Sequence, residues 1–168
     1  MDILSICQWL EKTPFAAAMR DSNWLFDITE TAHTLGIILV AGTIMLVDLR
    51  LLGLGLKEER VSEVVQRIVP WTLAGFAFMV VTGGWLFASE ARKLYHSPAF
   101  RIKLILLGLA GLNALIFHLT VYPAAADWDD RKVLPARARL AGAISLILWA
   151  CIIAAGRSIA YGPGYDQS

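Results

Sequence analysis

Charged residues are scarce in this sequence, making up 17% of its 168 residues, whereas 57% are hydrophobic. Water-soluble domains carry roughly 25% charged residues, so the composition argues against a soluble domain. Fifteen Lys and Arg nearly balance fourteen Asp and Glu, which leaves a net charge of +1. Binding to nucleic-acid phosphates requires a basic surface that this balance does not provide. Nucleic acid is therefore excluded as a partner.

Cysteine is almost absent, and Cys7 and Cys151 lie far apart in apolar surroundings. They form no CxxC pair, so zinc, iron–sulfur and disulfide frameworks are not indicated, and we predict two buried thiols. The sequence also lacks a Walker A loop, a GxGxxG motif, an HExxH motif and a nucleophile elbow. These absences argue against nucleotide-dependent and hydrolytic enzymes.

Long apolar runs are what the sequence has in abundance. A helix needs about 20 apolar residues to cross a hydrocarbon layer of roughly 30 Å. Four windows meet this requirement, namely residues 34–56, 69–89, 102–122 and 140–161, and short polar segments join them. We therefore predict an all-α fold, an integral membrane four-helix bundle over residues 31–168, in contact with the lipid bilayer. The odd-numbered spans run parallel to each other.

Residues 1–30 form a separate N-terminal segment. Charged residues such as Glu11 and Arg20 interrupt its apolar stretches, so it does not have the pattern of a secretory signal. Its apolar residues recur at helical spacing, and Thr13–Pro14 is a favourable cap and first-turn pair for a second short helix. We predict an interfacial amphipathic helical segment packed against the face of the bundle that carries both termini, called here the near face.

The opposite face, called the far face, carries slightly more positive charge. Without the two basic residues of the N-terminal segment, eight basic residues lie on the far face and five on the near face. Positive charge favours the cytoplasmic side of a membrane. The count favours a cytoplasmic far face.

Ionisable residues inside membrane helices are costly, and each is a candidate functional residue. His33 and Asp48 are fifteen residues apart in the first span, and Lys103 and His118 have the same separation in the third. Fifteen residues correspond to about 22 Å along a helix. Because the two spans are parallel, we predict two polar layers. The near layer contains His33, Lys103 and Arg157, and the far layer contains Asp48 and His118.

The far layer has two interpretations. Asp48 can contact His118 or Arg50 and thereby hold the helices together, because charges inside membranes pair. Alternatively, His118 is an axial ligand of haem iron, and Asp48 orients its imidazole. In that case Asp48 and Arg50 belong to the cofactor-binding residues.

The near layer offers a second candidate iron ligand, His33, beside which Gly36 leaves room for a flat macrocycle. Lys103 and Arg157 are candidates for holding haem propionates, or else for reaching lipid headgroups. His96, in the loop before the third span, either pairs with His33 around one iron or is an exposed loop residue. Three histidines allow at most one bis-histidine haem in one chain.

Four segments carry a resemblance to known proteins, namely ETAHTLGIILVAGTIMLVDLRLLGL, PWTLAGFAFMVVTGGWLF, YHSPAFRIKLILLGLAGLNALIFH and ARLAGAISLILWACIIAAGRSIAY. In these segments, and over nearly its whole length, the sequence resembles a family of small bacterial four-span membrane proteins of unknown function. Distantly, it is also similar to the copper-resistance D-type membrane proteins and to four-helix membrane b-type cytochromes of the bacterial inner membrane. The cytochrome resemblance implies haem b and electron transfer with quinone or a soluble donor.

These observations together predict a homo-oligomeric, b type cytochrome-like protein of the bacterial inner membrane. It would bind one or two haem b groups and pass electrons between quinone or a soluble donor and a redox partner protein, which makes it a candidate oxidoreductase. Two alternatives remain. The intramembrane His, Asp and Lys residues would suit a proton or copper-ion transport protein, and the polar layers would equally suit a non-catalytic membrane subunit.

Overall fold

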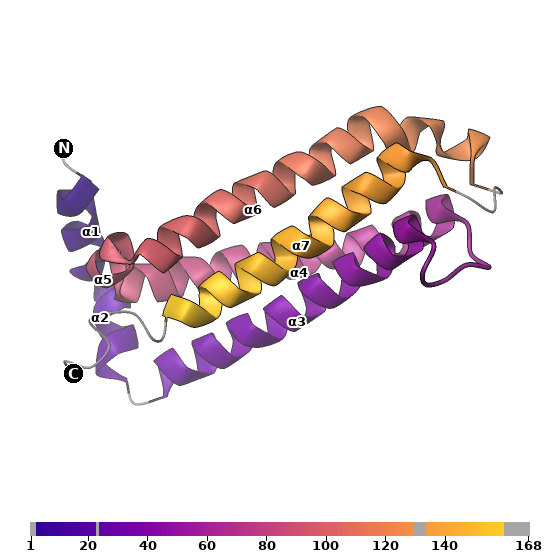
Figure 1. Ribbon diagram of the computed structural model, residues 1–168. Helices are drawn as coiled ribbons and strands as arrows, with labels where there is room; N and C mark the ends of the chain where they lie inside the picture. Colours follow the sequence, from indigo (N-terminus) through magenta and orange to yellow (C-terminus); the bar gives the residue numbers. More distant parts are fainter. Residues whose placement is uncertain (1–2, 23, 130–133, 160–168) are drawn as a thin grey trace.

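The fold was determined from a computed structural model, which describes residues 3–22, 24–129 and 134–159. Four long helices lie side by side, and three short helices gather at one end (Figure 1). The third long helix continues through a π-helical turn and a 3-10 helix. The long helices are α3 (Leu25–Leu52), α4 (Val61–Ser89), α6 (Pro98–Ile116) with its extensions η1 (Phe117–Val121) and η2 (Tyr122–Asp127), and α7 (Ala136–Ile159).

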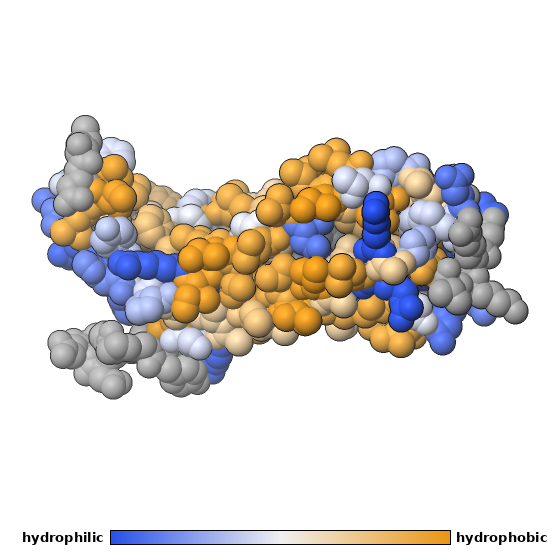
Figure 2. Space-filling view, turned by 45° about the horizontal axis from the view of Figure 1, so that its top comes forward, coloured by the Kyte–Doolittle hydropathy of each residue, from blue (hydrophilic) through white to orange (hydrophobic). Residues whose placement is uncertain are grey.

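All four long helices are long and apolar enough to cross a membrane. Large apolar side chains point outward, since Leu35, Ile105 and Ile147 are each more than 60% exposed. Figure 2 shows a hydrophobic belt between two hydrophilic ends. Such a surface is stable only against lipid. The chain is a multi-pass membrane protein, and the predicted all-α four-helix membrane bundle is confirmed.

The helices extend beyond the predicted spans, mainly at their N-terminal ends, into sequence outside the apolar windows. Ser22 Oγ accepts a hydrogen bond from the Leu25 N–H (3.2 Å), and Ser97 Oγ accepts one from the Phe100 N–H (3.3 Å). Hydropathy detects the hydrocarbon layer, whereas caps mark where a helix begins. The second short helix ends at Asp21, and the first long helix begins at Leu25. The predicted bounds 34–56, 69–89, 102–122 and 140–161 become Leu25–Leu52, Val61–Ser89, Pro98–Ala125 and Ala136–Ile159.

The helix packing leaves one side of the bundle open. α3 packs along α4 and α7, and α6 packs along α7, but α4 and α6 form no comparable interface. At the near end, the Phe87 ring of α4 stacks on the Phe100 ring of α6, with centroids 5.6 Å apart. At the far end, Val65 of α4 shares a core cluster with Phe117 and Ala125, so the stretch without a shared interface lies between the two ends.

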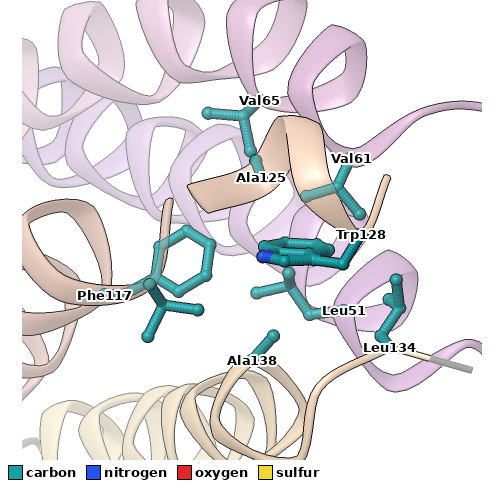
Figure 3. Close-up of a cluster of buried hydrophobic side chains, with 9 residues drawn as sticks. Leu51, Val61, Val65, Phe117, Ala125, Trp128, Leu134 and Ala138 are labelled. Carbon is teal, nitrogen blue, oxygen red and sulfur yellow. The ribbon is translucent and has the colours of Figure 1, made fainter. Parts of the chain in front are cut away.

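The core consists of two separate clusters. The near cluster contains Val40, Met79, Trp149 and Ile152. The far cluster closes the opposite end of the bundle, and there the indole of Trp128 lies among side chains from several helices (Figure 3). Trp128 follows η2 directly, so the chain that leaves α6 folds back and covers the end of the bundle. The far cluster contains Leu51, Val61, Val65, Phe117, Val121, Ala125, Trp128, Leu134 and Ala138.

The N-terminal segment packs across the near end as α1 (Ile3–Glu11) and α2 (Pro14–Asp21), beside α5 (Ala91–His96) (Figure 1). The second short helix has the predicted cap, because Thr13 Oγ1 accepts a hydrogen bond from the Ala16 N–H (3.4 Å). Arg20 donates to the Ser89 carbonyl (3.1 Å), which ties the segment to α4. These contacts fix α1 and α2 against the bundle.

The prediction of two buried thiols is correct for only one of them. Cys7, on α1, is buried, whereas Cys151, on α7, is exposed. A thiol behaves as a small apolar group, so an apolar sequence context does not distinguish a core position from one that faces lipid.

Candidate ligand-binding cavity

A cavity of about 290 Å³ lies between the two core clusters. Leu51 and Phe117 of the far cluster line it, as do Val40 and Trp149 of the near cluster. All four spans contribute to its walls, which are mostly apolar. A concave, mainly apolar site with a few polar groups is the usual form of a small-molecule site. The polar lining residues are Asp48, Thr72, Asn113, His118 and Ser145.

The cavity lies along the side of the bundle where α4 and α6 lack an interface. Leu73 and Phe76 of α4 line it and are also 63% and 43% exposed on the outer surface. On the other side, α6 buries none of its residues from Pro98 to Ile116. Side chains that line the cavity thus also meet lipid.

Both helices that flank this opening are irregular at the same level. Pro70 lies inside α4 next to the lining residues Val69 and Thr72, and it cannot donate the helical hydrogen bond to the Gln66 carbonyl. Opposite, α6 changes to the π-helical turn η1, which includes His118. π-helical turns often occur at functional sites. The regular α-helical hydrogen bonding is therefore interrupted in both helices that line this side of the cavity.

Asp48 is 4% exposed on the α3 wall of the cavity. It is hydrogen-bonded to Ser145 of α7, and its Oδ2 atom has no hydrogen-bond partner among the described residues. The predicted contact with His118 or Arg50 is therefore wrong. Arg50 lies outside the cavity and donates from Nε to the Glu59 carbonyl (2.6 Å), which holds the loop after α3.

His118 lines the same cavity from η1. Its Nδ1 lies 2.9 Å from the Ala114 carbonyl oxygen, and because a carbonyl can only accept, Nδ1 carries the proton. In the neutral ring, Nε2 then has a free lone pair. The structure brings Asp48 and His118, from the predicted far layer, into one cavity without direct contact between them.

His33, in the near layer, is held firmly against α4. The Thr82 hydroxyl donates to the Phe78 carbonyl (2.9 Å), so it accepts from His33 Nδ1, which is also 2.9 Å away. The ring lies so close to Gly83 that a Cβ there would be 3.0 Å from His33 Cε1. The space expected beside Gly36 is filled, since a Cβ on that glycine would meet Met79 Cγ at 2.9 Å.

Of the remaining candidate residues, Lys103 lies inside the bundle, whereas Arg157 and His96 lie at its surface. Lys103 extends across α7, where its Nζ would be 3.7 Å from a Cβ on Gly156, and its charge interacts with His33. Arg157 is exposed in the last turn of α7. His96 lines a separate hollow on the near surface, beside Glu11. The structure thus groups His33 with Lys103 but does not place His96 in the bundle interior.

Two polar residues of the far layer were not identified as site residues from the sequence. Ser145 bonds to Asp48, and Asn113 donates from Nδ2 to the Ala141 carbonyl (3.0 Å), which joins α6 to α7. A lone hydroxyl or amide within an apolar window was the available signal. Within the described ranges, no group of three or more His, Cys, Asp or Glu side chains could hold a metal ion.

The comparisons with known proteins identify a family but no function. No curated protein matches the chain, and no solved structure matches it. A family model matches residues 23–162, a range that includes nearly the whole membrane bundle and its cavity. The resemblance to small four-span proteins of unknown function is thereby confirmed. The chain belongs to this family of unknown function, DUF6644.

Proposed function

We propose that the cavity binds a lipid-soluble molecule of the quinone class and that the protein is a membrane-bound component of electron transfer. The observation that carries this proposal is a mostly apolar cavity lined by lipid-exposed residues of α4 and by Asp48 and His118. Asp48 Oδ2 is buried there without a hydrogen-bond partner among the described residues. A quinone has a flat apolar ring with polar oxygens and a long apolar tail. The ring would occupy the cavity, and the tail would leave between α4 and α6 into lipid.

Haem b at His118 is the second candidate function. His118 Nδ1 donates a hydrogen bond to the Ala114 carbonyl (2.9 Å). This bond favours the haem candidate, because it orients the imidazole ring and leaves Nε2 as the nitrogen that would bind iron. The described residues offer one imidazole to the cavity. His33 is about 22 Å away along the bundle, so the two histidines do not form a bis-histidine pair. His118 would hold the group, which would supply one-electron chemistry.

The alternatives receive less support from the cavity. A copper route would need several soft or imidazole ligands in sequence, and no such group is found among the described residues. A proton route would use Asp48 and His118, yet the near layer is separated from them by the near core cluster. A merely structural far layer would leave no reason for the unpaired Asp48 oxygen, because buried polar atoms are normally satisfied.

We further propose the bacterial inner membrane as the location, a homo-oligomeric state, and a soluble donor or redox partner protein that exchanges electrons with the bound quinone. These proposals rest on the resemblance to b-type cytochromes. The exposed apolar surface of the spans supports contact with lipid.

The proposal can be tested by measuring the binding of a decyl-substituted benzoquinone to the purified protein in lipid nanodiscs. Trp149 lines the cavity, so bound quinone should quench its fluorescence, and Trp149→Phe should remove that part of the signal. Gly111→Leu should weaken binding at least tenfold because the new side chain would project from a residue that lines the cavity.

Gly108→Leu is the matched control. Gly108 lies one turn earlier on the same helix, outside the cavity lining, and neither glycine has a neighbouring atom within 4 Å of an added Cβ. Equal affinity in the two variants would contradict the proposed site. An absorption spectrum of the same sample, oxidised and reduced with dithionite, tests the second candidate. A Soret band lost in His118→Ala would establish haem there and displace the quinone proposal.

A further inference from the structure

A second hollow, called here the near-surface hollow, lies at the near end of the molecule and shares no lining residue with the cavity. It has a volume of about 900 Å³, and residues of α1, α2, α5 and the end of α4 line it (Figure 1). Its lining is rich in charge. Four basic and two acidic side chains give it an excess of two positive charges among the described residues. The charged lining residues are Glu11, Lys12, Arg20, Glu90, Arg92 and Lys93.

The two acidic side chains of the near-surface hollow are already paired. Glu11 accepts hydrogen bonds from the backbone N–H of Arg92 (2.8 Å) and from its Nε, and Glu90 accepts one from Lys93 Nζ (3.0 Å). In the part of the chain that the structure describes, no carboxylate pairs with the two other cations. The excess positive charge therefore belongs to Lys12 and Arg20.

Arg20 is held in place without being neutralised. Its Nη1 donates to the Ser89 carbonyl (3.1 Å) and its Nη2 to the Glu11 carbonyl (2.6 Å), which end α4 and α1 respectively. A carbonyl is uncharged, and a guanidinium has five N–H donors in one plane, so further donors remain. A guanidinium that is already positioned matches the oxygens of a phosphate group. Arg20 is exposed and can reach such a group from the surface.

The near-surface hollow lies at the level of the lipid headgroups. Trp9, Trp24 and Trp85 are all exposed at this end of the molecule, and Trp side chains gather at the boundary between hydrocarbon and headgroups. Trp85 lies one turn before Ser89, the residue whose carbonyl holds Arg20. Arg20 is thus placed just beyond the hydrocarbon, where the phosphates of anionic lipids are the anions that attract basic side chains.

From the charge, the fixed guanidinium and the level in the bilayer, we infer that the near-surface hollow binds the headgroup of an anionic phospholipid. The phosphate would accept hydrogen bonds from Arg20 and lie beside Lys12, while the acyl chains would remain in the bilayer. A zwitterionic headgroup carries a cation of its own, which the excess positive charge repels. The hollow therefore favours phosphatidylglycerol over phosphatidylcholine. Binding here does not depend on what occupies the cavity.

The test is native mass spectrometry of the full chain in non-ionic detergent, which gives the dissociation constant of the first bound lipid. Phosphatidylglycerol should bind at least about fivefold more tightly than phosphatidylcholine, the factor expected for one basic side chain at a membrane surface. Equal affinities would overturn the inference. Glycerol 3-phosphate has the same phosphate chemistry without acyl chains. If it displaced phosphatidylglycerol at equal concentration, the ligand would be a soluble phosphate compound and the lipid assignment would be wrong.

A substitution assigns the binding to the near-surface hollow. Lys12→Gln should weaken phosphatidylglycerol binding about fivefold. Lys12 is exposed, whereas the loss of Arg20 would also release the ends of α1 and α4. Lys57→Gln is the matched control, because Lys57 is exposed in the loop after α3, lies outside the hollow and carries the same charge. Its lipid affinity should equal that of the wild type. An equal loss in both variants, or no loss in Lys12→Gln, would overturn the inference.

Discussion

At the scale of single residues, a missing side chain sets how closely α3 and α7 approach each other beside Asp48. A Cβ on Gly142 would lie 3.1 Å from the backbone oxygen of Asp48 and 3.1 Å from Leu51 Cβ. A backbone atom cannot move aside as a flexible side chain can. Gly142→Ala should therefore destabilise the protein by about 1–3 kcal/mol, measured by thermal unfolding in detergent. Gly108→Ala, with open space around it, should have no such effect, and equal melting of the two variants would contradict this packing.

The hydrogen bond between His33 and Thr82 can be tested by substituting the threonine. Thr82→Val removes the acceptor of the Nδ1 proton, and hydrogen bonds between membrane helices are worth about 0.6 kcal/mol on average. We expect a small loss of stability and a change in the ¹⁵N signals of the His33 ring. In Thr120→Val, where an exposed hydroxyl bonds only to the Ile116 carbonyl (2.7 Å), these signals should stay as they are. Identical ring signals in wild type and Thr82→Val would show that the bond is absent.

Residue spacing in the sequence was enough to predict that Asp48 and His118 share one level of the membrane. It was not enough to predict what each would contact. Asp48 bonds to Ser145 and not to His118 or Arg50, because the rotation of α7 about its axis decides which side chain it presents. Gly36 was expected to leave room for a cofactor, but Met79 fills that space. Such contacts depend on which side chains the neighbouring helix presents, and the spacing of residues within one helix gives no information about that.

At the scale of elements, the segment after α6 serves as a cover for the far end of the bundle. Trp128 is 5% exposed at the centre of the far cluster (Figure 3). Trp128→Ala should cost about 3–5 kcal/mol of stability, the usual cost of removing a buried aromatic ring. Trp128→Phe should recover part of this loss. Trp71→Ala removes an indole at a position that is 66% exposed and serves as the control. The melting temperatures of the three variants are compared by thermal unfolding.

The apolar windows predicted all four membrane helices because length and hydropathy are properties of one segment. The helix ends were missed because they lie outside the apolar windows, where the Ser22 and Ser97 hydroxyls accept hydrogen bonds from the first turns of α3 and α6. The open side between α4 and α6 was not predictable for a different reason. All four spans are apolar around most of their circumference, so hydropathy does not show which helices become neighbours. The cavity follows from that arrangement.

At the scale of the whole molecule, the two ends of the bundle are built differently. The near end is covered by α1, α2 and α5 (Figure 1), and the far end by the cluster around Trp128 (Figure 3). The cavity lies nearer the far end, since its lining residue Asp48 is one turn before the end of α3 at Leu52. A ligand entering from lipid would thus sit closer to the far face, which determines the side on which a soluble redox partner would exchange electrons with it.

Which side that is can be predicted from the basic residues, which favour a cytoplasmic far face. With Cys7 and Cys151 replaced by alanine, Glu58→Cys in the loop after α3 should be protected from a membrane-impermeant maleimide in intact cells, whereas Gln8→Cys on α1 should react. Both positions are exposed, so access depends only on the membrane. In inverted vesicles the pattern should reverse. If the intact cells already gave the reverse pattern, only the orientation would be wrong. If both positions reacted from the same side, the four-span topology itself would fail, because the end of the first span and the N-terminal segment must lie on opposite faces.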